Sequence, residues 1–556
     1  MTDLLQHLPI LPIVVPLVAG AALLLLSETR RTARMAIGLT SLAAQLAAAC
    51  VLLFLTSDAA TDIWREGVGV YQIGNWPAPF GIVLVVDRLA AIMVALGAAV
   101  GLAALIYSIG NWDRPGQPFQ SLFQFLMMGL NGAFLTGDLF NLFVFFEVLL
   151  ASSYGLVLRG VGATRMKAGL HYIAVNLLAS FLFLIGVALI YGVAGTLNMA
   201  DLTGRVAALA PADRTLLDVG AAILGIAFLI KAGSWPFNFW LPITYSAALA
   251  PVAAAFAMMT KVGVYAVVRV GTLISQDEAA ASMLGLAMFY IGFATLVAGT
   301  LGMLASLHLP RLVSHSVIAS TGILLAALGL GIEALTAPVL FYLIISVLTT
   351  AAFFLLTGMT ERMRTAIAAA PSAAAPTEVA EPLPQPSYVA FGVREPDPYA
   401  TEEGGIAIPA AMAFLGLVFV SCVLLVTGLP PLPGFVAKFA LLATAIGSAP
   451  EAGVSVQAWM LSVAVLVTGF VGVLALTRIG VNLFWTVTER TTPRLRVLEA
   501  APVAALVVIC LALGLAAGPV MGYLESTARS LHDPQTYIRT VLSSHSPAAE
   551  ARDPAP

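Results

Sequence analysis

The sequence predicts an all-α, polytopic membrane protein of about fourteen transmembrane helices, arranged as two inverted five-helix repeats that contain broken helices. Three observations lead to this fold class. First, 60% of the 556 residues are hydrophobic and only 10% are charged, whereas soluble domains carry about 25% charged residues. Second, apolar segments of about 20 residues, the length that spans a bilayer, follow one another with short polar joints. Third, two of these segments carry proline and glycine interruptions near a lysine, which is typical of transport proteins with inverted repeats.

The apolar segments give the order of the predicted spans. They cover residues 9–26, 33–55, 82–107, 119–136, 138–158, 168–193, 216–241, 244–272, 281–305, 309–332, 335–358, 406–448, 457–485 and 499–522. Residues 406–428 and 431–448 together form one interrupted span. We divide the chain into an N-terminal three-helix segment (1–110), a first repeat of spans 4–8 (119–273), a second repeat of spans 9–13 (281–485), and a last span with a polar tail (486–556).

The second repeat contains the one long polar interruption, residues 365–404, in which Ala, Pro and Glu dominate. This composition predicts an extended cytoplasmic linker. An even number of spans places both termini on one side of the membrane. Arg30, Arg31, Arg34 and Lys167 belong to the more cationic set of loops. Because cytoplasmic loops carry the excess of Lys and Arg, we expect both termini to be extracytoplasmic.

Three of the four lysines, Lys231, Lys261 and Lys438, lie within apolar spans. A charged side chain at the bilayer centre costs roughly 2.5–3.5 kcal/mol on insertion scales, and such residues usually mark a pathway. Glu147 is the matching acid in the fifth span. An unpaired buried carboxylate is protonated, so we predict that Glu147 pairs with Lys231 from another helix. A fixed ion pair that only holds the helices together is the alternative.

The stretch LIKAGSWPFNFWLP, residues 229–242, breaks a predicted helix beside its lysine. Pro236 removes a backbone donor and clashes with the carbonyl four residues earlier, and Gly233 and Ser234 tolerate the distortion. A broken helix at membrane depth persists only where protein covers it or where it lines a hydrated cavity. We therefore expect water to reach Lys231.

The second half of the chain repeats this arrangement in GLPPLPGFVAKF, residues 428–439, which leads to Lys438. Its helix-breaking residues are Pro430, Pro431, Pro433 and Gly434. Interrupted spans at corresponding positions of two halves indicate inverted repeats and a transport path. His315 in the tenth span then takes the place of Glu147, with a packed, hydrogen-bonded histidine as the alternative. Lys261 lies between the two breaks in chain order and suits a central relay.

Other residue types give little indication of further chemistry. The three cysteines lie in apolar runs without metal-ligand spacing, so we interpret them as packing residues and predict no metal site. The net charge of −3 is too small to indicate a nucleic-acid partner.

A glutamate in span 5, lysines in spans 7 and 8, and a lysine at the break of span 12 resemble the antiporter-like subunits. These occur in respiratory complex I, in membrane-bound hydrogenases and in Mrp-type sodium/proton antiporters. Within that family, GNWPAPFGIVLVVDRLAA (74–91) and GLPPLPGFVAKFALL (428–442) are similar to the D subunit of the Mrp, Pha or Mnh complex.

The resemblance implies that Glu147 and Lys231 form an ion pair at the proton entrance, that Lys261 is the central relay and that Lys438 is the exit or gate. It implies a proton-translocating subunit of a multisubunit Na⁺(K⁺)/H⁺ antiporter, which is a secondary transporter rather than an enzyme and holds no redox cofactor. The expected partners are other membrane subunits, H⁺, Na⁺ or K⁺, and the lipids of the bacterial cytoplasmic membrane. Two alternatives remain: a proton-pumping membrane subunit of an NADH:quinone oxidoreductase, and a non-conducting structural subunit.

Overall fold

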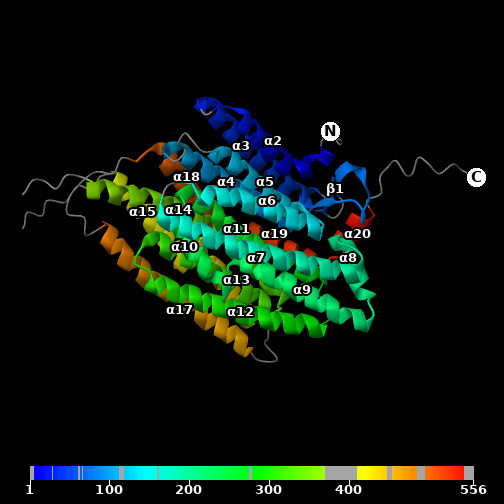
Figure 1. The fold of residues 1–556 in the computed structure, drawn as a ribbon. Coiled ribbons are helices and arrows are strands. Elements are labelled where there is room, and N and C mark those ends of the chain that lie inside the picture. The colour runs from blue at the N-terminus through cyan, green and yellow to red at the C-terminus, as the bar shows by residue number, and fades with distance from the viewer. Residues whose placement is uncertain are drawn as a thin grey trace, which may run out of the picture.

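The computed structural model describes residues 5–27, 29–60, 63–64, 67–111, 118–159, 162–274, 278–369, 410–447, 454–484 and 495–543. Most of the predicted linker, 370–404, lies outside the described residues. In Figure 1 the long helices run side by side through one bundle.

The N-terminal segment contains three long helices and a small antiparallel hairpin. Its elements are η1 (Leu8–Ile10), α2 (Leu11–Leu25), α3 (Arg31–Leu55), η2 (Asp58–Ala60), β1 (Gly69–Gln72), η4 (Ile73–Asn75), β2 (Val83–Val86) and α4 (Arg88–Asn111). The strands pair in the register Gly69 to Val86. The third predicted span, 82–107, therefore begins too early: its first residues form strand β2, because a run of β-branched valines favours a strand, and the helix begins at Arg88.

The first repeat follows with five spans, of which the fourth is broken. Its elements are α5 (Phe119–Leu135), α6 (Leu139–Val157), α7 (Ala163–Ala194), α8 (Met199–Ala207), α9 (Pro211–Ala232), η5 (Phe237–Phe239), α10 (Trp240–Ala247) and α11 (Ala250–Ile274). The break separates α9 from η5 and α10, as the proline and glycine predict.

The second repeat has the same succession, and three further helices end the chain. The elements are α12 (Glu278–Ala305), α13 (Leu309–Gly329), η6 (Glu333–Leu335), α14 (Thr336–Ala369), α15 (Ala410–Thr427), α16 (Pro433–Gly447), α17 (Val456–Phe484), α18 (Val497–Leu515), α19 (Ala517–His532) and α20 (Gln535–Leu542). The break now separates α15 from α16. The last predicted span, 499–522, is too long, because α18 ends at Leu515.

The predicted fold class is confirmed. In the described part of the chain, thirteen helices are long and apolar enough to cross a membrane. Helix α5, with 17 residues, is just shorter than these, and α16 is the second half of the broken span that starts with α15. Each of the fourteen predicted spans thus corresponds to one helix or to one broken pair. The predicted boundaries of the four chain segments stay predictions.

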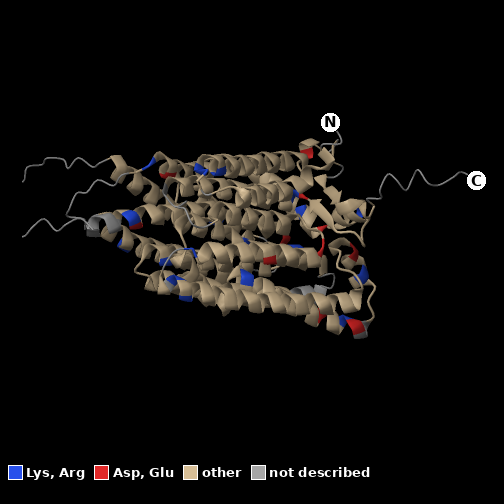
Figure 2. Ribbon diagram, turned by 45° about the horizontal axis from the view of Figure 1, so that its top comes forward, with Lys and Arg blue, Asp and Glu red and all other residues tan. Residues whose placement is uncertain are grey.

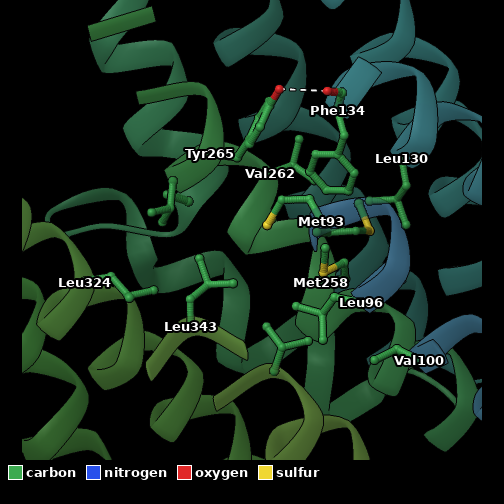
Figure 3. Packing of buried hydrophobic residues seen from close by; sticks show 14 of the residues in the cluster. Met93, Leu96, Val100, Leu130, Phe134, Met258, Val262, Tyr265, Leu324 and Leu343 are labelled. Atoms are coloured by element: carbon green, nitrogen blue, oxygen red, sulfur yellow. Dashed lines mark hydrogen bonds between the residues drawn. The ribbon is translucent and has the colours of Figure 1, made fainter. Parts of the chain in front are cut away.

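Equivalent helices of the two repeats make equivalent contacts. Helix α5 packs against α6 and α7 against α9 and α10, while α12 packs against α13 and α14 against α15 and α16. Helices α11 and α14 pack against each other at the centre. About nine-tenths of the residues in their most apolar segments are buried. Figure 3 shows apolar side chains of α11, among them Met258 and Val262, packed with Met93 of α4.

Both described ends of the chain lie at one end of the bundle, since η1 and α20 both contact β1. The C-terminal helices α19 and α20 lie after the last span. Figure 2 shows Lys and Arg positions at both ends of the bundle and a few charged positions inside it. The interior charges are the ones that position the site.

Candidate functional site

Helix α9 ends at Ala232, one residue after Lys231, and the first break begins there. Gly233 adopts a left-handed conformation with φ of 72°, which glycine tolerates without steric cost. The amide of Gly233 donates to the carbonyl of Ile230 at 3.1 Å, and the amide and hydroxyl of Ser234 both donate to the carbonyl of Leu229 at 3.0 and 2.9 Å. These bonds are a helix C-cap. The carbonyl groups of Leu229 and Ile230 are therefore satisfied without the lysine.

Protein from the other repeat covers part of this break. The backbone amide of Trp235 donates to the hydroxyl of Thr295 on α12 at 2.8 Å. The break is thus fixed to the second repeat by a hydrogen bond at a position where the helix itself supplies no partner.

Lys231 and Glu147 are close, but a serine hydroxyl separates them. Lys231 is 5% exposed, and its ammonium donates to Ser180 Oγ on α7 at 3.4 Å. The same hydroxyl donates to Glu147 Oε1 in a short contact. The ammonium also lies 5.0 Å from the ring centre of Phe146, a cation–π distance. Ser180, from a third helix, thus connects the base and the acid. The predicted Glu147–Lys231 ion pair stays a prediction.

Lys261 on α11 is 2% exposed and reaches across to α13. Its ammonium donates to Ser320 Oγ at 3.2 Å and to Thr321 Oγ1 at 3.1 Å. No acid is among these partners, so two neutral hydroxyl groups solvate the ammonium. Ser320 in turn shares a hydrogen bond of 2.5 Å with Ser346 on α14.

A small cavity of mixed polar and apolar lining lies beside these two serines. It has a volume of about 30 Å³, roughly the space of one water molecule, and its lining includes Ser320, Ser346, Thr350, Thr427 and Lys438. Ser320, which binds Lys261, and the side chain of Lys438 therefore line the same cavity. The structure thus brings Lys261 and Lys438 together through hydroxyl groups and room for water.

Lys438 lies on α16, after the second break, and is 7% exposed. Its ammonium donates to the carbonyl oxygens of Val426 and Thr427, each at 2.9 Å. These carbonyls belong to the last turn of α15, which ends at Thr427 and leaves them without helical partners. The freed carbonyls of the second break therefore bind the lysine itself.

The two breaks have the same local plan but hold their lysines differently. Gly233 and Gly428 both have positive φ, 72° and 76°, and a proline follows each of them within three residues. Lys231 precedes its glycine by two positions, whereas Lys438 follows its glycine by ten. The lysines thus lie on opposite halves of the broken helices, Lys231 before its break and Lys438 after its own.

The structure does not connect His315 to this group of side chains. Its Nδ1 atom is buried and has no hydrogen-bond partner among the described residues. The ring lies against α12, where a Cβ atom on Gly302 would come within 2.1 Å of Nδ1. A relay role for His315 stays a prediction.

Sequence reasoning missed the hydroxyl groups that join the charged residues: Ser180, Ser320, Thr321 and Ser346. Serine and threonine are common in membrane helices, where they bond across helix interfaces, so their presence alone carries little signal. Among the described residues, no group of three or more His, Cys, Asp or Glu could hold a metal ion.

Two inverted repeats with broken helices, and buried lysines on α9, α11 and α16, define an antiporter-like membrane protein. The family described as "NADH:quinone oxidoreductase/Mrp antiporter, TM" matches residues 136–372. The chain is 49% identical to the D subunit of a probable K(+)/H(+) antiporter of Rhizobium meliloti (strain 1021), over 98% of this chain and 99% of the relative. It is 32% identical to the D subunit of the Na(+)/H(+) antiporter of Alkalihalophilus pseudofirmus (strain ATCC BAA-2126 / JCM 17055 / OF4), over 97% and 100%.

A solved structure agrees with these relatives. A chain of the Mrp complex from Dietzia sp. DQ12-45-1b superposes with a TM-score of 0.77 at 25% identity, covering 97% of this chain and 99% of that one. The chain belongs to the family of D subunits of Mrp-type monovalent cation/proton antiporters. It is a multi-pass membrane protein and one component of a transporter.

Proposed function

We propose that this subunit moves protons through the bacterial cytoplasmic membrane along Glu147, Lys231, Lys261 and Lys438, as part of a multisubunit Na⁺(K⁺)/H⁺ antiporter. One observation carries the proposal: the hydroxyl chain and cavity that join Lys261 to Lys438. Buried lysines that only held helices together would not need a water-sized cavity with hydroxyl groups in its lining. The relative that is 49% identical is named for K⁺, so K⁺ is the first cation to test, followed by Na⁺.

Proton transfer in this scheme depends on exchange of hydrogen-bond partners. When the Ser180 bridge holds Glu147 near Lys231, the negative charge stabilises the ammonium form; when the bridge opens, the lysine releases its proton toward Lys261. Moving one charge through 100 mV is worth about 2.3 kcal/mol. A hydrogen bond to a charged group is worth about 1.5–3 kcal/mol. A lysine that exchanges one or two hydrogen-bond partners can therefore control the flow of protons.

The proposal extends to orientation and partners. Both termini face away from the cytoplasm in this scheme, in agreement with the cationic loops predicted from the sequence. Other membrane subunits surround the chain, because its relatives are subunits of assemblies.

Vesicles that contain the complete complex test the function. Lys261→Ala removes the central ammonium, and we expect cation-driven proton movement, followed with a pH-sensitive dye, to be lost. Lys167→Ala is the matched control, because Lys167 is exposed at the start of α7 and should leave transport unchanged. Undiminished antiport by Lys261→Ala, with normal assembly of the complex, would contradict the relay.

The family description also names NADH:quinone oxidoreductase, which supports a second candidate, a proton pump that redox chemistry in partner subunits drives. The gently purified complex decides between the two. Flavin and iron–sulfur absorbance together with NADH oxidation would favour the pump, and a colourless complex that exchanges cations for protons would favour the antiporter.

A further inference from the structure

The stretch GNWPAPFGIVLVVDRLAA forms the hairpin strand β2 and the start of α4, and it places Asp87 and Arg88 beside a second cavity. This cavity, here called the vestibule, has a volume of about 400 Å³, and its lining includes Asp58, Asp87, Arg88, Arg529, Thr536 and Tyr537. It is much larger than the space between Lys261 and Lys438 and has room for several water molecules.

The vestibule opens to solution at the end of the bundle that holds both described chain ends. The side chain of Asp58 is 77% exposed, and Arg529 is exposed as well. Helix α20, which supplies Thr536 and Tyr537, lies against β1 and α8 at this end. The chain thus builds a polar hollow from segments more than 400 residues apart.

Both acids of the vestibule are paired with arginines. Arg88 contacts Asp58 in a short ion pair, and Arg269 Nη2 lies 2.6 Å from Asp87 Oδ1. Each acid therefore has an arginine partner. Arg529, the remaining charged residue of the lining, donates to Ser526 Oγ at 3.0 Å. Acids that are already paired do not fit a site that strips a cation from water, and they do fit a solvated passage.

The inner end of the vestibule leads to the helix that carries Lys261. The side chains of Arg269 and Asp87 are 6% and 10% exposed, so their ion pair lies between the vestibule and the interior. The guanidinium also lies 5.3 Å from the ring centre of Tyr537, which covers it from α20. Arg269, Tyr265 and Lys261 follow one another at intervals of four residues along α11, so about 12 Å of helix separates Arg269 from Lys261.

An apolar layer interrupts this row. The hydroxyl of Tyr265 donates to the carbonyl of Phe134 at 2.8 Å, and Figure 3 shows Met93, Val262 and Leu130 packed below it. Such a layer excludes water and ions, as hydrophobic constrictions do in channels. The described conformation is therefore closed on this side, while the cavity between Lys261 and Lys438 lies inside the closure.

We propose that the vestibule is the external mouth of the ion path in this subunit, and that the Asp87–Arg269 pair with the apolar layer behind it forms the outer gate. The inference rests on the proposed function, since it gives the proposed path an external opening that joins it at its central relay, Lys261. Opening requires α11 to move relative to α4 and α20, which separates Arg269 from Asp87 and from Tyr537.

Cysteine labelling at the vestibule tests the mouth. Thr536→Cys places a thiol in the lining, and Gln535→Cys places one on the next residue, which is exposed and outside the lining. Vesicles with the complete complex are treated with a membrane-impermeant, charged methanethiosulfonate on the vestibule side. We expect labelled Thr536→Cys to lose at least about tenfold in antiport rate and equally labelled Gln535→Cys to retain it. The unsubstituted protein, treated in the same way, controls for its own cysteines.

The outcomes distinguish a failure of the proposed mouth from a failure of the proposed proton-transport function. Full labelling of Thr536→Cys without loss of antiport would overturn the mouth, and the function would still stand if Lys261→Ala is inactive. The gate has its own test in the double variant Asp87→Asn/Arg269→Gln, which removes both charges together. We expect it to leak protons in the absence of Na⁺ and K⁺, and tight vesicles with full coupled antiport would overturn the gate.

Discussion

The ammonium of Lys438 donates to the carbonyl oxygen of Thr427 at 2.9 Å, across the break that separates α15 from α16. Lys231 makes no such bond, because Gly233 and Ser234 cap the first break themselves. One lysine therefore completes the backbone hydrogen bonding of its break, and the other is held only by side chains. This difference predicts that equivalent substitutions at the two lysines have different consequences.

Lys438→Ala should destabilise the protein more than Lys231→Ala, although both should lose antiport. Removal of the Lys438 ammonium leaves the carbonyls of Val426 and Thr427 without a partner, at a cost of about 1–3 kcal/mol for each group that water does not reach. Thermal unfolding of the purified complex measures the difference. Equal melting temperatures for the two variants would contradict the assigned role of Lys438 in the break. Lys438→Arg, which keeps donors at the site, should recover part of the stability.

Ser180 links Glu147 to Lys231, so Ser180→Ala should slow antiport. The loss of one hydrogen bond to a charged group, about 1.5–3 kcal/mol, corresponds to a rate change of about tenfold or more. Ser180→Thr keeps the hydroxyl and should recover activity. The rates of the two variants in vesicles are compared with that of Ser152→Ala, a buried serine on α6 whose hydroxyl bonds only to its own helix, at Val148. If Ser180→Ala and Ser152→Ala behave alike, the bridge has no role in transport.

Gly428→Ala should impair transport more than Gly233→Ala. Both glycines have positive φ, which costs roughly 1–2 kcal/mol for a residue with a Cβ atom. The new methyl group at position 428 would come within 2.6 Å of Lys438 Cδ, whereas at position 233 it would meet only the flexible end of Leu241, at 2.7 Å. The first change displaces the lysine from its carbonyls and the second does not. Antiport rates at equal expression check the order, and the reverse order would contradict it.

The sequence was sufficient for the fold class because length and hydropathy decide which segments span a bilayer. It also located the breaks, since proline and glycine act locally. It did not reveal that Ser180 separates Glu147 from Lys231, because this depends on which faces of α6, α7 and α9 meet. The start of α4 at Arg88 was missed for a similar reason: Val83–Val86 is as apolar as a helix and pairs with β1 only in the folded chain.

Ser320 and Thr321 both bind the ammonium of Lys261, but only Ser320 lines the cavity that leads to Lys438. If protons pass through this cavity, Ser320→Ala should lower the antiport rate by about tenfold or more, since it removes both a partner of Lys261 and its link to Ser346. Thr321→Ala removes a partner at a similar distance and leaves the link intact, so its rate should fall less. Proton flux in vesicles, measured for both variants at matched expression, decides the point. A larger loss for Thr321→Ala would mean that Lys261 needs solvation by hydroxyl groups but does not send its proton toward Lys438 by way of Ser320.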